Sequence, residues 1–106
     1  MAWLLLVVAG LLEIVWASAM KQSHGFTRPV PTIVFGFAAV ASMAALALSM
    51  RTLPLGTAYA IWTGIGTVGA FAFGIVMLGE SATPLRLLAA GLIVAGLILM
   101  KLVTNE

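Results

Sequence analysis

The chain consists of four apolar runs of about twenty residues each, separated by short polar stretches that contain prolines and glycines. An apolar helix of this length spans a hydrocarbon core of roughly 30 Å. The 106 residues are 63% hydrophobic and 8% charged, far from the balance of a soluble domain. Because the charges cluster between the runs, they cannot cover a soluble core. The sequence therefore predicts an integral membrane protein.

We place the helices at residues 2–20, 32–50, 57–78 and 84–103, within a single all-α transmembrane domain of residues 1–106. No basic region precedes the first run, so we expect a retained helix rather than a signal peptide. The short connections leave no room for a soluble domain or a nucleotide-binding motif. No motif for enzymatic chemistry is present, and we expect no cofactor. Transport by this chain alone would therefore use an ion gradient.

Two classes of site are unsupported by the composition. The chain has no cysteine and a single histidine, His24, which cannot form a metal cage within one chain. The net charge of +2 is small and dispersed, whereas nucleic-acid binding usually shows as a clustered basic face. We therefore expect neither a metal site nor a nucleic-acid partner.

Positive charges are nearly balanced between the two membrane faces. Lys21, Arg28 and Arg86 belong to one face, and Arg51, Lys101 and the α-amino group to the other. Since the lysine and arginine bias of short loops sets orientation, this balance predicts that copies insert both ways. Four helices make a thin bundle, so we expect an antiparallel homodimer with a two-fold axis in the membrane plane.

The last predicted helix carries small residues suited to a contact between subunits. Gly91 and Ala95 form a small-xxx-small pair, and Gly96 is adjacent. Packing within one subunit is the alternative interpretation.

Glu13 is the acidic residue inside an apolar run, about 16 Å along the first predicted helix and near the bilayer middle. Such residues usually face a cavity or a partner and mark ion or substrate routes. The alternative is a protonated Glu13 that joins helices by a hydrogen bond. Gly10, Trp16 and Ala17 share its helix face at three- and four-residue spacings.

A second candidate face lies on the third predicted helix. Tyr59, Trp62, Gly66 and Gly69 form one stripe there, although an aromatic stripe alone often serves packing. A carboxylate beside indole faces suits a small organic cation. Ser42 could add a hydrogen bond or bond its own preceding turn. Protons and cation would compete for the same acid, which would couple their movements in opposite directions.

Three segments carry a resemblance to a known family: residues 10–17 (GLLEIVWA), 21–28 (KQSHGFTR) and 54–64 (PLGTAYAIWTG). With them the whole chain resembles the small multidrug resistance family. Trp16 and residues 63–70 (TGIGTVGA) look like the guanidinium-exporter subtype, since the quaternary-ammonium subtype usually has glycine at the Trp16 position.

The resemblance implies an antiparallel homodimer in a bacterial inner membrane that exchanges guanidinium for protons. The implied site residues are Glu13 as the shared binding site and Trp16, Ser42, Tyr59 and Trp62 as its lining. We also expect Gly10, Gly64 and Gly66 to serve as pocket backbone or packing positions. Two alternatives stay open. A broad quaternary-ammonium pump would need a larger pocket, and a non-transporting membrane subunit would pair Glu13 with a partner's basic residue.

Overall fold

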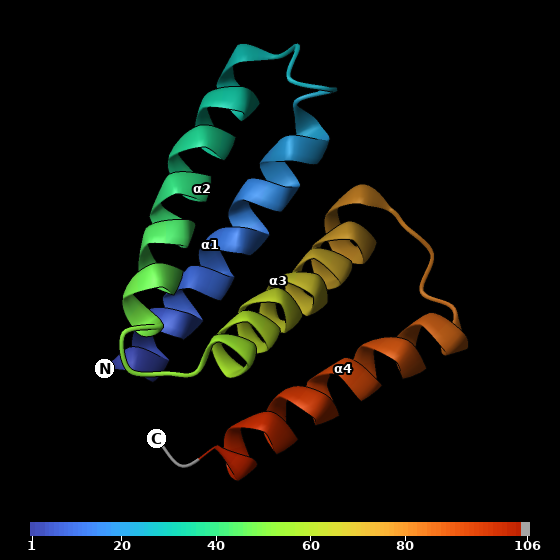
Figure 1. Cartoon of the computed structure of the whole chain (residues 1–106). Coiled ribbons are helices and arrows are strands. Elements are labelled where there is room, and N and C mark those ends of the chain that lie inside the picture. The colour runs from blue at the N-terminus through green and yellow to red at the C-terminus, as the bar shows by residue number, and fades with distance from the viewer. Residues whose placement is uncertain (105–106) are drawn as a thin grey trace.

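The computed structural model describes residues 1–104, which form four α-helices joined by three short connections (Figure 1). The helices are α1 (Ala2–Gln22), α2 (Pro29–Ser49), α3 (Leu55–Leu78) and α4 (Pro84–Val103). Each is long and apolar enough to cross a membrane, with a mean hydropathy between 1.8 and 2.1. The prediction of an all-α chain with four transmembrane helices is therefore confirmed.

Helix α2 begins three residues earlier than the sequence predicts, at Pro29 rather than at residue 32. The prolines suggest a surface connection, but Pro29 and Pro31 both lie in the first turn of α2. A proline fits there because the first backbone N–H groups of a helix have no intrahelical acceptor. Arg28, in extended conformation, precedes the helix. The other helix ends differ from the predicted bounds by at most two residues.

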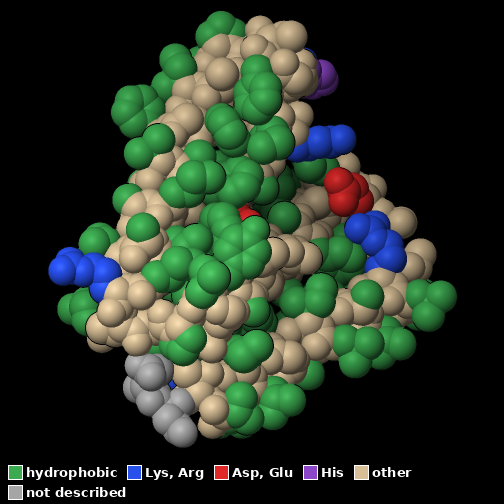
Figure 2. All heavy atoms as spheres, viewed as in Figure 1, with side chains coloured by type: hydrophobic (Ala, Val, Ile, Leu, Met, Phe, Trp, Pro, Cys, Tyr) green, Lys and Arg blue, Asp and Glu red, His purple; other side chains and the backbone are tan. Residues whose placement is uncertain are grey.

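Helix α1 packs against both α2 and α3, whereas the backbone of α4 approaches only α3 (Figure 1). No residue of α4 is buried. The described chain measures 43 × 34 × 16 Å, so its helices form a thin slab. Figure 2 shows apolar side chains spread over much of one face. Most of the apolar surface is therefore available to lipid or to a second subunit.

Glycines on α1 and α3 allow neighbouring helices to approach closely. A Cβ at Gly10 of α1 would lie 2.6 Å from Ile65 Cγ2 and 2.8 Å from Ile65 Cβ on α3. A Cβ at Gly64 would likewise meet the Leu97 side chain of α4. Small residues at helix contacts are expected in a membrane, because lipid provides no hydrophobic drive between helices and close packing must hold them together.

The contact of Gly10 with Ile65 makes α1 intolerant of a methyl group at this position. We expect Gly10→Ala to lower the free energy of unfolding by about 1–3 kcal/mol, the usual cost of overpacking. Gly36→Ala on α2 is the matched control, because a Cβ there meets nothing within 4 Å. Equilibrium unfolding in detergent measures both variants, and equal stability of the two would contradict the close contact.

Candidate functional site

A hydrogen-bonded chain through Ser42 joins three helices at the centre of the candidate site. Ser42 of α2 is fully buried, and its Oγ donates to the Ala9 carbonyl oxygen of α1 at 2.7 Å. The same Oγ accepts from Trp62 Nε1 of α3 at 3.0 Å. Ser42 thus bonds a neighbouring helix rather than its own preceding turn. Its proton and the indole N–H are both engaged in this conformation.

Glu13 of α1 lies against Gly66 of α3. A Cβ added at Gly66 would overlap the Glu13 carboxylate, so the absence of a side chain at Gly66 provides the space for the acid. Glu13 Oε1 is buried and has no hydrogen-bond partner among the described residues. No basic side chain of residues 1–104 comes within ion-pairing distance of Glu13 either. The structure therefore holds an uncompensated acid between two helices.

Trp16 lies one helical turn after Glu13 and also has an unused polar atom. Its ring meets the edge of Phe35 on α2, with centroids 5.8 Å apart and planes at 83°. Its Nε1 is buried without a partner, as is Thr63 Oγ1 of α3. Neither Phe35 nor Thr63 is among the site residues predicted from the sequence, although Thr63 lies in the segment 63–70 that resembles the guanidinium-exporter subtype. The helical spacing of Thr63 and Gly66 could have indicated Thr63, but no sequence signal distinguishes Phe35 from the other apolar residues of α2.

Tyr59 and Trp62 stack on α3, but they differ in exposure. Their centroids lie 5.4 Å apart at an interplanar angle of 56°. Trp62 is 7% exposed, whereas Tyr59 is 53% exposed and faces out of the subunit. Tyr59 could line the site only where another subunit or lipid covers this face.

The predicted small-residue positions separate into two groups. Gly10, Gly64 and Gly66 each take up a side chain from a neighbouring helix. Gly91 and Gly96 of α4 meet nothing within 4 Å of an added Cβ. They lie on the helix with no buried residue, so their role in a subunit contact stays a prediction.

The candidate site has a single carboxylate, Glu13, and its predicted aromatic and hydroxyl residues lie on the same three helices, α1, α2 and α3. No group of three or more His, Cys, Asp or Glu side chains able to hold a metal occurs in the described part of the chain. An ionised, unpaired carboxylate within a bilayer costs several kcal/mol. Glu13 can lower this cost by taking a proton or by binding a cation. Both outcomes use the same oxygen atoms, so the two ligands exclude each other.

Comparisons with known proteins show which family the chain resembles. The family model described as Small Multidrug Resistance protein matches residues 1–102. The protein named "Guanidinium exporter" of Citrobacter freundii is 59% identical over 105 residues, covering 99% of this chain and 100% of that protein. A protein of the same name from Salmonella typhimurium strain LT2 is 61% identical, over 96% of this chain and 97% of its own length. Another, from Escherichia coli strain K12, is 56% identical, over 99% of this chain and 100% of its own length.

The match covers nearly the whole chain, including all four membrane-spanning helices and the acid in α1. The chain therefore belongs to the small multidrug resistance family of multi-pass transporters of the bacterial inner membrane.

Proposed function

We propose that this chain exports guanidinium ion in exchange for protons, with Glu13 binding each in turn. The observation that carries the proposal is the buried Glu13 Oε1, which has no hydrogen-bond partner and no basic neighbour among the described residues. The name "Guanidinium exporter" of relatives 56–61% identical to this chain supports the choice of substrate.

The chemistry of guanidinium suits the groups around Glu13. The ion is planar and donates hydrogen bonds in its plane, which a carboxylate accepts in pairs. The faces of the ion can stack on aromatic rings, and Trp16 lies one turn from the acid. A tetraalkylated ammonium ion has no N–H donors and needs more volume. The close contact of α1 with α3 at Gly66 therefore favours the smaller cation.

Competition for Glu13 couples the two movements. A cation that binds on one side releases protons from the acid, and protons taken up on the other side release the cation. The empty, ionised site is the form that crosses least easily, because its charge is unpaired. If two protons are exchanged per guanidinium, each cycle moves net charge, and the membrane potential contributes about 2.3 kcal/mol per charge per 100 mV.

We infer that two copies of opposite orientation share this site. The slab is 16 Å thick, which leaves little interior within one subunit. Helix α4 has no buried residue, and Tyr59 faces outward. An antiparallel partner would cover both features and would bring two Glu13 residues to one cavity. The balanced charges of the loops favour insertion in both orientations.

Replacing the acid tests the proposed exchange. We expect purified protein in liposomes to give an electrical current on addition of guanidinium, and Glu13→Gln to reduce it to that of empty liposomes. The amide has nearly the shape of the acid but can neither ionise nor exchange a proton.

Glu13→Asp is the matched control. Its side chain is one methylene shorter but keeps the carboxylate, so this variant should retain a measurable current. A guanidinium current that survives in Glu13→Gln would refute the role of this acid. Equal currents from guanidinium and tetraethylammonium would show multidrug efflux instead.

The space at Gly66 tests the position of the acid. We expect Gly66→Ala to displace the Glu13 carboxylate, since the new Cβ takes the carboxylate's place. Guanidinium exchange should therefore fall even under conditions in which the variant is still folded. Gly36→Ala, whose Cβ meets open space, should exchange normally. Tracer uptake and thermal unfolding of both variants separate loss of function from loss of fold.

Orientation can be tested directly because the natural chain contains no cysteine. Ala82→Cys reports the connection between α3 and α4, and Thr52→Cys reports the opposite face; both residues are exposed. We expect a membrane-impermeant maleimide added to intact cells to label about half of each variant, because opposite orientations are nearly equally favoured by the loop charges. Full labelling of one variant and none of the other would establish a single orientation.

A further inference from the structure

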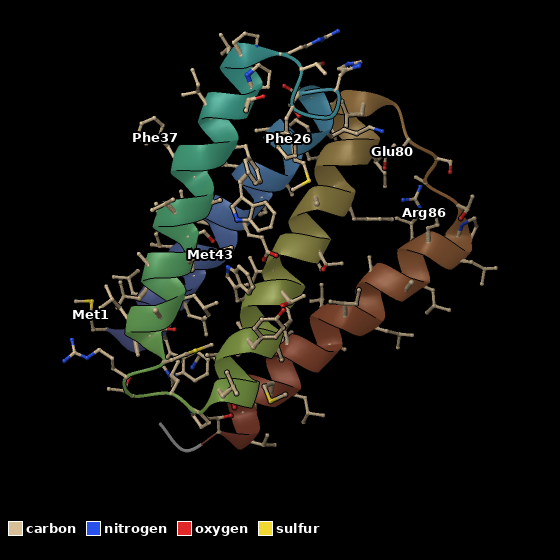
Figure 3. The ribbon with its side chains drawn as sticks, turned by 45° about the horizontal axis from the view of Figure 1, so that its top comes forward. Met1, Phe26, Phe37, Met43, Glu80 and Arg86 are labelled. Carbon is tan, nitrogen blue, oxygen red and sulfur yellow. The ribbon has the colours of Figure 1, made fainter. Side chains whose placement is uncertain are left out.

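A guanidinium group of the chain itself occupies a polar site where α3 joins α4. Arg86, in the first turn of α4, places Nη2 3.8 Å from Glu80 Oε1. Its Nη1 donates to the Ser81 carbonyl oxygen at 2.5 Å and lies 3.4 Å from Ser81 Oγ. Its guanidinium carbon lies 4.8 Å from the centroid of the Phe71 ring. Figure 3 shows Glu80 and Arg86 in the space between the end of α3 and the start of α4.

These groups are the ones that a free guanidinium ion requires. Glu80 supplies the countercharge and Ser81 supplies neutral acceptors, while Phe71 supplies an aromatic face. Planar, multiple-donor recognition distinguishes guanidinium from a compact ion such as sodium. The site therefore recognises the same chemical group as the proposed substrate.

The acid of this site is held by the backbone rather than left free at the surface. Glu80 follows Gly79, whose φ of 71° ends α3 in the left-handed conformation. The Glu80 backbone N–H donates to the Gly74 carbonyl oxygen at 3.0 Å. Its carboxylate then lies against Gly74, in the space that a Cβ there would occupy. Gly74 thus gives room to Glu80 as Gly66 gives room to Glu13.

A cavity of about 350 Å³ connects this site to the helix that carries Glu13. Arg86, Glu80 and Phe71 line it together with Ala17, Ser18 and Lys21 of α1. Ala17 lies one helical turn, about 6 Å, beyond Glu13. Ser18 Oγ is buried and has no hydrogen-bond partner among the described residues. The cavity therefore extends from Ala17, one turn beyond Glu13, to the α3–α4 connection.

The charges of this lining make Arg86 and a free cation mutually exclusive. The lining holds two basic side chains, Lys21 and Arg86, and one acid, Glu80. While Arg86 pairs with Glu80, the remaining charge of Lys21 repels an incoming cation. When Arg86 moves away, the acid and the aromatic face become free. Both side chains of the pair are about two-fifths exposed, at 39% and 42%, so Arg86 can move without unfolding the chain.

We propose that Glu80, Ser81 and Phe71 form an outer guanidinium-binding site, which Arg86 occupies when substrate is absent. The substrate part of this inference rests on the proposed function. Guanidinium passing between Glu13 and the membrane surface displaces Arg86 and binds Glu80. A tethered side chain competes at an effective concentration of about 1 mM or above, so the outer site fills only at high substrate concentration. Weak binding suits a site on a route, because the ion must leave again.

Binding can be measured without transport by nuclear magnetic resonance of labelled protein in a Glu13→Gln background, which removes the central site. Guanidinium chloride is titrated against sodium chloride at matched ionic strength. We expect saturable shifts of the Phe71 ring and the Gly74 amide with guanidinium alone. Arg86→Gln should lower the half-saturating concentration several-fold, because it removes the tethered competitor. Glu80→Gln should abolish the shifts.

Three results would overturn the outer site: no saturable shift with Arg86→Gln, equal shifts with sodium, or a half-saturating concentration independent of Arg86. The spectrum of each variant also reports whether it is folded. If Arg86→Gln does not fold, Arg86→Lys replaces it, since a lysine keeps the charge but lacks the planar fork and should also lower the half-saturating concentration.

Transport separates this proposal from the proposed function. With Glu13 intact, we expect Glu80→Gln to raise the guanidinium concentration for half-maximal current, because the outer site that loads the route is lost. A normal Glu13-dependent current unaffected by Glu80→Gln would reject the outer site alone. Absence of any Glu13-dependent guanidinium current in the unsubstituted chain would reject the proposed function.

Discussion

The hydroxyl of Ser42 connects α2 to both α1 and α3 by hydrogen bonds. It donates to the Ala9 carbonyl oxygen and accepts from Trp62 Nε1, so a single buried atom serves a backbone and an indole on two other helices. Within a bilayer, association of helices depends on close packing and on such hydrogen bonds, since lipid is as apolar as the side chains. The position of α3 relative to α1, and hence the space around Glu13, depends on this contact.

The same close packing determines how the acid behaves. Glu13 is accommodated because Gly66 has no side chain, and it is left without a hydrogen bond or a basic partner among the described residues. A protein that used Glu13 only to join helices would pair it. An unpaired acid against Gly66 is instead stabilised by taking a proton or a cation, and this is the physical basis of the proposed exchange.

A second carboxylate also lies against a glycine, where α3 joins α4, but this one has a basic partner. Glu80 lies against Gly74 as Glu13 lies against Gly66, but Glu80 is paired with Arg86 and partly exposed. The cavity beside Glu80 is lined by Ala17 and Ser18 of α1, the helix that carries Glu13, and this is the basis for proposing that the two acids lie on one route. Glu13, with a buried and unpaired oxygen, is expected to bind a proton or a cation strongly. Glu80 is expected to bind a cation only weakly, because it is partly exposed and already paired with Arg86.

The sequence by itself determined the four apolar helices, the position of Glu13 within the first of them and the near balance of loop charges, because length, hydropathy and charge are properties of local segments. It also predicted Ser42 and Trp62 as site residues, which stays a prediction, and it did not predict their bond to each other. Only the tertiary structure decided that Pro29 lies inside α2 and that Gly66 faces Glu13. It also decided that the rings of Phe35 and Trp16 are in contact and that Arg86 pairs with Glu80. Each of these depends on how two helices or a connection approach in space, and the apolar periodicity of a membrane helix does not distinguish the face that meets a neighbour from the face that meets lipid.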